Sequence, residues 1–305
     1  MVLGCSIVVS VILLASVLAA GSGADSSTAI LIEVDQSGNG VYRKIQDAIN
    51  SVPSNNSDHI FILVKPGVYE EKIVVPADKP FITLSGTKAT ETIITWSDSG
   101  EIFESPTFSV LASDFMARYL TIQNNHGPGA KAVALRVSGD RAAFMNCRIL
   151  SHQDTLLDDR EVPFAFCGRR DGGDNGAAEA EGGGGDGFTF VKCKITGVKS
   201  AVLGRPWGKY SRVVFALTYM SNVVLPQGWD DWGDYSKQRS AYYGEYKCYG
   251  AGARSSKRVK WSHRLSGREA APYLRGDMIG GSSWIRSAPS HFRRISAAIS
   301  PQPNS

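Results

Sequence analysis

Short runs of alternating apolar and polar positions recur along most of the chain, and this pattern predicts a protein built from strands. Gly, Pro, Asp or Ser residues separate the runs. The first predicted strands are Ile60 to Lys65, Lys72 to Val75, Ile82 to Ser85, Thr92 to Trp96 and Phe108 to Leu111. Because the intervals between them are too short for crossover helices, the spacing excludes a doubly wound α/β sheet.

Two helices are predicted, one near each end of the strand-rich region. Apolar residues from Tyr42 to Val52 recur at helical spacing, and Pro53 then ends the pattern. Ser266 and Glu269 form a capping-box pattern ahead of residues 270–274. We expect the first helix to cover the N-terminal end of a stack of strands, and the second to cover the far end.

A degenerate repeat indicates how the strands stack. Four times a Phe is followed five residues later by an aliphatic residue or Met, and successive Phe residues are 29, 46 and 25 positions apart. The pairs are Phe115/Leu120, Phe144/Ile149, Phe190/Ile195 and Phe215/Met220. Coils of about 20 to 30 residues that share one core are typical of a parallel β-helix, so we predict that all-β fold. A β-sandwich with accidental spacing stays open as the alternative.

The stretch from 160 to 187 interrupts this rhythm. It is rich in Gly, Asp and Glu and offers little that could line a core, so we interpret it as an aberrant, flexible Gly-rich insert. Gly182, Gly184 and Gly187 match a dinucleotide fingerprint, but no predicted strand precedes them and no helix follows. The long step of the repeat falls across this insert, where one coil is expected.

Residues 1–24 differ from the rest of the chain. The apolar run Ile7 to Leu18, followed by small residues, predicts a signal peptide over 1–24 and a single domain over 25–305. No Lys or Arg precedes the run, so an uncleaved anchor is the alternative. We expect a secreted protein without stable membrane association. The triplet Asn55-Asn56-Ser57, a glycosylation acceptor in a polar turn, agrees with export.

Composition and charge narrow the function classes. With 43% hydrophobic and 20% charged residues, disorder throughout is excluded. The net charge of +4, with basic side chains crowded between Lys237 and Arg264, suits an acidic polymer. Basic residues interleaved with aromatics are not seen, so nucleic acid is not expected as a partner. The Cys and His residues lack zinc spacing, no metal or cofactor is implied, and Cys147 and Cys193 are expected to be core thiols.

Two polar clusters are the candidates for chemistry. Gln153-Asp154-Thr155 and Gly204-Arg205-Pro206-Trp207-Gly208 lie about fifty residues apart but can adjoin on one face of a β-helix. Carboxylates near an Arg and an amide can carry out acyl transfer: one Asp attacks an ester, another donates a proton, and the amide stabilises the oxyanion. The alternatives are a turn residue for Asp154, and a structural ion pair and a core aromatic for Arg205 and Trp207.

Six motifs in one order give the chain a family resemblance. They are Lys65-Pro66-Gly67-Val68-Tyr69-Glu70-Glu71, Ala132-Val133-Ala134-Leu135-Arg136, Gln153-Asp154-Thr155-Leu156, Leu203-Gly204-Arg205-Pro206-Trp207-Gly208, Pro226-Gln227-Gly228-Trp229 and Tyr243-Gly244-Glu245-Tyr246. The chain resembles plant-type pectinesterases over roughly residues 30 to 292, apart from the insert. The resemblance implies a right-handed parallel β-helix that hydrolyses methyl esters of polygalacturonate in the cell wall, without a cofactor.

The resemblance also implies roles for individual residues and partners. Asp154 resembles the general acid and then base, Gln153 an oxyanion-hole amide, and Arg205 the clamp on the nucleophilic carboxylate. Trp207 and Trp229 resemble sugar-stacking aromatics. The expected partner of this carboxylic ester hydrolase is methyl-esterified homogalacturonan (pectin). We expect a monomer, and a proteinaceous inhibitor is kept open as a partner.

Two departures from the family pattern bear on activity. Lys131 stands where the family has its first active-site Gln, and its ammonium could stabilise an oxyanion or pair with a catalytic carboxylate. The Asp-Phe-Ile-Phe-Gly segment with the nucleophilic Asp is absent, and Asp171 and Asp174 lie near its expected place in the insert. The alternative function is therefore a catalytically impaired, pectin-binding family member.

Overall fold

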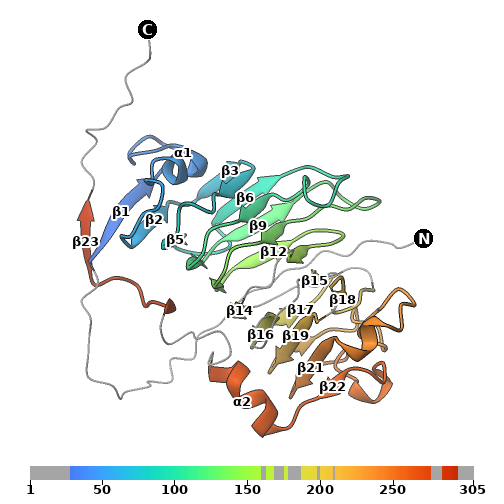
Figure 1. The fold of residues 1–305 in the computed structure, drawn as a ribbon. Helices are drawn as coiled ribbons and strands as arrows, with labels where there is room; N and C mark the ends of the chain where they lie inside the picture. The colour runs from blue at the N-terminus through green and yellow to red at the C-terminus, as the bar shows by residue number, and fades with distance from the viewer. Residues whose placement is uncertain are drawn as a thin grey trace.

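The computed structural model describes residues 28–158, 163–167, 175–177, 187–197, 200–208, 210–275 and 284–294. The chain winds into stacked coils, and each strand pairs in parallel with the equivalent strand of the neighbouring coil (Figure 1). The fold is a right-handed parallel β-helix, as predicted. The alternative of a β-sandwich is wrong, because the ladders between the described strands are parallel.

The largest sheet runs the length of the solenoid and has eleven strands. In spatial order these are β22 (His263–Arg264), β21 (Tyr242–Tyr246), β19 (Arg212–Ala216), β16 (Gly187–Val191), β14 (Pro163–Cys167), β11 (Ala142–Met145), β8 (Phe115–Arg118), β5 (Ile82–Ser85), β2 (Ile60–Val64), β1 (Thr28–Val34) and β23 (His291–Arg294). Among the described strands, the last (β23) thus pairs with the first (β1), and covers the edge of the N-terminal coil.

Three shorter sheets complete the coils. The six-stranded sheet has the order β18 (Arg205–Pro206), β15 (Asn175–Ala177), β13 (Leu156–Asp158), β10 (Leu135–Val137), β7 (Phe108–Val110) and β4 (Ile73–Val75). The four-stranded sheet has β12 (Arg148–Leu150), β9 (Thr121–Asn124), β6 (Thr92–Trp96) and β3 (Gly67–Glu70). The remaining pair is β17 (Lys194–Ile195) with β20 (Tyr219–Met220). The six-stranded sheet matters most below, because it carries Arg205.

The interior of the coils holds the predicted repeat. All eight residues of the four Phe pairs are buried in one continuous core. The backbone register aligns Phe144, Phe166, Phe190 and Phe215 in successive coils, which divides the step of 46 residues into 22 and 24. Cys147 lies in this core as expected, and burial raises the pKa of its thiol to about 12.

The interpretation of 160–187 as a flexible insert is wrong at two places. Residues 163–167 form β14 between β11 and β16, and residues 175–177 form β15 between β13 and β18. These strands supply the coil that the repeat required. Without them, each neighbouring strand would leave a row of backbone N–H and C=O groups unpaired. The rest of the stretch, including Asp171 and Asp174, lies outside the described residues, as does the predicted signal peptide.

The two predicted helices are present. Helix α1 (Ile45–Asn50) is shorter than predicted, and the Glu71 carboxylate accepts hydrogen bonds from the N–H groups of Ile45 and Gln46 at 2.9 and 3.0 Å. Helix α2 (Gly267–Arg275) begins with the predicted capping box: the Ser266 N–H donates to Glu269 Oε2 at 2.8 Å.

The far end of the solenoid is closed differently from the prediction. Helix α2 packs on the outer face of the large sheet, where Ala270 meets Val214 and Leu265 (Figure 1). Side chains of the segment before β22 cover the core instead, among them Val259 and Trp261. Two short 3-10 helices, η1 (Lys237–Arg239) and η2 (Ser255–Lys257), lie in the loops of this end.

Candidate active site

Asp154 lies in a tight turn just before β13. Its backbone is left-handed (φ 53°), and the preceding Gln153 carbonyl accepts a hydrogen bond from the Ala132 N–H at 3.3 Å, beside β10. The residue is only 3% exposed. Such a strained, fixed turn holds the carboxylate in one place, as sites of chemistry often require.

Arg205 brings a positive charge to this carboxylate. Its Nη1 atom lies 3.6 Å from Asp154 Oδ1, and both side chains are largely buried, at 11% and 5% exposure. Burial raises the pKa of Asp154 above its ordinary value, while Arg205, Lys131 and a hydrogen bond with Gln153 oppose that rise. A carboxyl group that keeps its proton to higher pH is suited to donating a proton.

A second carboxylate shares Arg205. The Oδ2 atom of Asp230 lies 3.3 Å from Arg205 Nε, and its side chain is 41% exposed. The segment with Asp230 reaches this place because Trp229 forms a parallel bridge with Gly204, next to Arg205. Sequence reasoning missed Asp230, since no motif marks it and its contact depends on that bridge.

Aromatic side chains border the pair. Trp207 is half-buried against Val133 and Leu157, and its ring and that of Trp232 form a T-shaped pair with centroids 5.4 Å apart. Trp232 is 48% exposed, and was also missed. The structure thus gathers Gln153, Asp154, Arg205 and Trp207 on one region, with the exposed Lys131 near enough to influence Asp154.

The expectation that Trp229 stacks on sugar is wrong. Trp229 is 1% exposed and lies in the core, where its ring centroid is 4.6 Å from that of Tyr243 and 5.8 Å from that of Phe215. Its ring therefore has no face for a ligand. The exposed indole of this loop belongs to Trp232, three residues further on.

Strand β15 lies between the coil of Asp154 and the coil of Arg205, and its position in register with Arg205 is a glycine, Gly176. Backbone register aligns Arg136 on β10, Leu157 on β13, Gly176 on β15 and Arg205 on β18 in one line. Residues in one such line face the same side of a sheet. Gly176 therefore occupies the place from which a side chain could stand beside Arg205, and glycine offers none.

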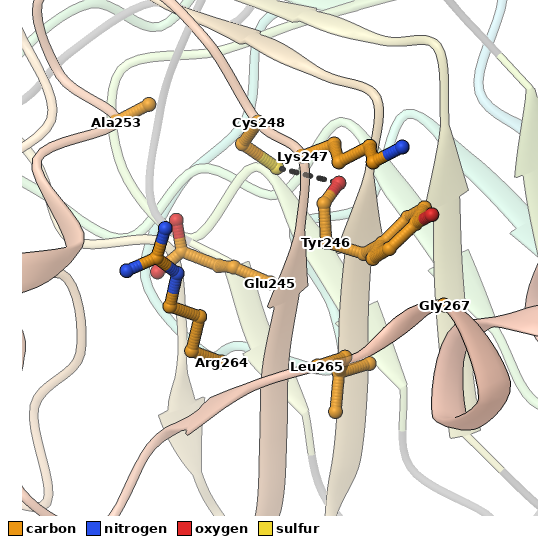
Figure 2. Close-up of a pocket in the computed structure, with 8 residues that line it drawn as sticks. All are labelled: Glu245, Tyr246, Lys247, Cys248, Ala253, Arg264, Leu265 and Gly267. Carbon is orange, nitrogen blue, oxygen red and sulfur yellow. Dashed lines mark hydrogen bonds between the residues drawn. The ribbon is translucent and has the colours of Figure 1, made fainter.

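A cavity of about 540 Å³ lies at the C-terminal end and shares no residue with this site. Figure 2 shows its lining, which includes Glu245, Cys248 and Arg264. Glu245 is paired with Arg258 at 2.6 Å, and burial raises the pKa of the Cys248 thiol to about 12. A paired carboxylate and a protonated thiol make this cavity part of the end closure rather than a reactive site.

Two features are absent from the described ranges. There, no group of three or more His, Cys, Asp or Glu side chains could hold a metal ion. No helix in the same ranges is long and apolar enough to cross a membrane.

Comparisons with known proteins agree with the fold. The profile described as Pectinesterase matches residues 31–164 and 180–282, and leaves unmatched the segment that contains β15. The Arabidopsis thaliana protein named Putative pectinesterase 11 is 52% identical over 300 residues, covering 89% of this chain and 85% of that one. Pectinesterase QRT1 from the same plant is 33% identical, covering 84% and 79%.

A solved structure of a pectin methylesterase is also similar to this chain. The pectin methylesterase from carrot superposes with a TM-score of 0.69 and 28% identity, covering 87% of this chain and 96% of that one. The family profile spans most of the chain, and the first of these relatives shares half of its residues. The chain belongs to the pectinesterase family.

Proposed function

We propose that the chain acts on methyl-esterified homogalacturonan as a carboxylic ester hydrolase, releasing methanol and leaving free carboxylates on the polymer. The observation that carries this proposal is the buried Asp154 beside Arg205, at 3.6 Å, with Gln153 next to it. Family membership supplies the reaction class, and the relatives named pectinesterase support the substrate.

Each residue of the site has a part in this proposal. The reaction needs an attacking carboxylate, which becomes acylated as methoxide leaves. Asp154, protonated, donates its proton to the methoxide and afterwards takes one from the water that hydrolyses the acyl-enzyme and frees that carboxylate. The Gln153 amide and the Lys131 ammonium stabilise the oxyanion. Arg205 orients the carboxylates, and Trp207 contacts the sugar ring.

A second candidate function is favoured by Gly176. In a two-carboxylate ester hydrolysis one group attacks the carbonyl carbon while the other donates a proton, and Asp154 cannot do both at once. On β15 the position in line with Arg205 has no carboxylate. The chain would then bind pectin while hydrolysing it at least about a thousandfold more slowly than an intact relative, because loss of an attacking group typically costs about 10⁴ to 10⁶ in rate.

We further propose that the protein is secreted to the cell wall, acts there as a monomer, and can meet a proteinaceous inhibitor. The exposed Asn55, in a turn with a left-handed backbone, offers an accessible glycosylation site on that route. Enzymatic removal of N-glycans should lower the apparent mass of the protein purified from plant cell walls. An unchanged mass, equal to that of Asn55→Gln, would contradict the use of this site.

Methanol release from highly esterified pectin tests the role of Asp154. Asp154→Asn should lower the rate about 10²- to 10⁴-fold, the usual range for loss of a general acid, while pectin binding persists. Asp98→Asn is the matched control, since Asp98 is a partly exposed carboxylate paired with Lys72 on an earlier coil. Equal rates for Asp154→Asn and the control would overturn the assignment.

A further inference from the structure

Long stretches of the last coils carry charge of only one sign. Residues 187–229, which include β16 to β20, contain several Lys and Arg residues but no Asp or Glu. The same is true of residues 246–268, which include β22. A surface with one sign of charge raises the local concentration of ligands of the opposite sign. These coils therefore favour an anionic partner.

On the outer side of these coils, two tyrosines stack beside a lysine. Backbone register aligns Lys194 on β17 with Tyr219 on β20, and Tyr219 forms a parallel bridge with Tyr249. Lys194 Nζ lies 5.0 Å from the centroid of the Tyr219 ring, and the two tyrosine rings form a T-shaped pair with centroids 5.6 Å apart. The next residues along the strands, Ile195 and Met220, are buried, so this row faces solvent. The sequence did not reveal this row of basic and aromatic residues, because its members lie a full coil apart.

The backbone that follows Tyr249 holds the Tyr219 ring in place. Gly250 has a left-handed backbone (φ 101°), and a Cβ atom at this position would lie 2.9 and 3.0 Å from two carbon atoms of the Tyr219 ring. Only glycine therefore allows the chain to pass so close to the ring. Tyr249 is 59% exposed, so its own ring is open to solvent beside this fixed neighbour. A fixed aromatic row reduces the ordering that a ligand must impose when it binds.

Two more lysines stand at the turns beside this row. Lys192 and Lys247 are both exposed, and each has a left-handed backbone (φ 55° and 46°). Their turns are two coils apart, with that of Leu217 between them, so strand spacing separates them by about 9.5 Å along the solenoid. Within the described ranges, no carboxylate lies at ion-pair distance from Lys192, Lys194 or Lys247. The row thus has three ammonium groups to pair with the charges of an anionic polymer.

We propose that the outer side of these coils is a second binding surface, for a segment of homogalacturonan that has lost its methyl esters. This Tyr249 surface consists of Lys192, Lys194, Tyr219, Lys247 and Tyr249. The exposed ring of Tyr249 packs on a sugar ring, and the ammonium groups pair with uronate carboxylates. The surface shares no residue with the candidate active site, and β17 and β20 form a sheet of their own. The proposal rests on the proposed function, because that reaction leaves free carboxylates on the polymer, and it adds an anchor for the product.

Affinity electrophoresis in native gels that contain either polygalacturonate or highly esterified pectin tests this surface. We expect Tyr249→Ala to weaken the binding of polygalacturonate about threefold to tenfold, the usual value of one aromatic contact. Lys194→Gln should weaken it about twofold to fivefold, and added salt should reduce this difference. Both changes should alter the binding of highly esterified pectin much less, because that polymer offers few carboxylates to the lysines.

Two exposed residues on earlier coils provide matched controls. Lys88→Gln removes the same charge from a side chain that is 64% exposed. Tyr119→Asn removes a 38% exposed ring from an equivalent left-handed turn, a conformation that Asn tolerates. Both controls should bind polygalacturonate like wild type. The Tyr249 surface would be overturned by a Tyr249→Ala protein that binds as tightly as wild type, or by a Lys194→Gln protein that binds no more weakly than Lys88→Gln.

The identity of the polymer is tested separately from the proposed function. Single-stranded nucleic acid also combines aromatic stacking with negative charge, so a labelled oligothymidylate is the third probe. Binding of the oligothymidylate as tight as that of polygalacturonate would overturn the uronate polymer as the ligand. A wild type that binds esterified pectin but not polygalacturonate would overturn the Tyr249 surface alone, whereas a wild type that binds neither polymer would overturn the proposed function.

Discussion

Replacing Arg205 by Gln should destabilise the protein by about 2 to 3 kcal/mol at neutral pH, because it leaves the Asp154 carboxylate buried without its main counter-charge. Removing one partner of a buried ion pair usually costs about 3 to 5 kcal/mol. The distance of 3.6 Å between Arg205 Nη1 and Asp154 Oδ1 exceeds that of a charge-assisted hydrogen bond. The cost of breaking this pair is therefore expected at or below the lower limit of that range. The pair with Asp230 adds less than about 1 kcal/mol, since Asp230 is 41% exposed.

The cost of Arg205→Gln should depend on pH. Burial already raises the pKa of Asp154 above 3.8, and removing the guanidinium raises it further. A carboxyl group whose pKa is raised by folding favours the folded state at pH below 3.8, and that contribution is lost as the pH rises through the folded-state value. The free energy of unfolding of the variant should therefore be close to that of wild type in acid, and should become lower than that of wild type as the pH rises toward neutral.

Urea unfolding of both proteins at about pH 4 and about pH 7 measures this difference. In an Asp154→Asn background, the cost of Arg205→Gln at neutral pH should fall below about 1 kcal/mol, because no buried charge is left alone. In an Asp230→Asn background the cost should stay near its full value. Equal costs in all three backgrounds and at both pH values would refute the reasoning, and would leave the packing of Arg205 as the source of its effect.

Two further predictions concern buried titratable groups away from the site. Arg258→Met should cost about 3 to 5 kcal/mol in the free energy of unfolding, since Arg258 and Glu245 are 4% and 8% exposed and lie 2.6 Å apart; the double variant with Glu245→Gln should cost less than the single one. Burial and the charges of Arg118 and Arg286 lower the pKa of His59 to about 4, so stability present above pH 6.5 is lost as the pH falls toward that value. His59→Gln should flatten this acid decline in urea unfolding, and an unchanged slope would exclude His59 as its cause.

Much of the fold followed from local patterns. The bounds of β5 and β6 match the predicted strands, because alternation and flanking turns define both segments. The Phe repeat identified the core, and the capping box marked the start of α2. The strands β1 and β3 were missed, and so was β14, whose short Phe-Ala-Phe alternation stands among Gly and charged residues. Pairing with neighbouring coils decides these segments, and composition cannot supply it.

The sequence predicted only part of the site. Its motifs named Asp154 and Arg205, which the structure places 3.6 Å apart. Asp230 and Trp232 could not be found, because their position depends on the bridge between Gly204 and Trp229. The error over Trp229 has the same origin. Whether a ring in this loop points into the core or out to solvent depends on the pairing register of the segment, and a shift of one residue reverses the direction of every side chain.

The most direct test concerns the position of Gly176 beside Arg205. Residues 176–180 would be replaced by Asp-Phe-Ile-Phe-Gly, with Asn-Phe-Ile-Phe-Gly as the matched control, and methanol release from esterified pectin would be measured for both and for the unaltered chain. We predict that the Asp version is at least about a hundredfold faster than the other two, because it alone supplies the attacking carboxylate. Methanol release by the unaltered chain as fast as that by the Asp version would contradict the second candidate function, and would show that another group of this chain already serves as the nucleophile.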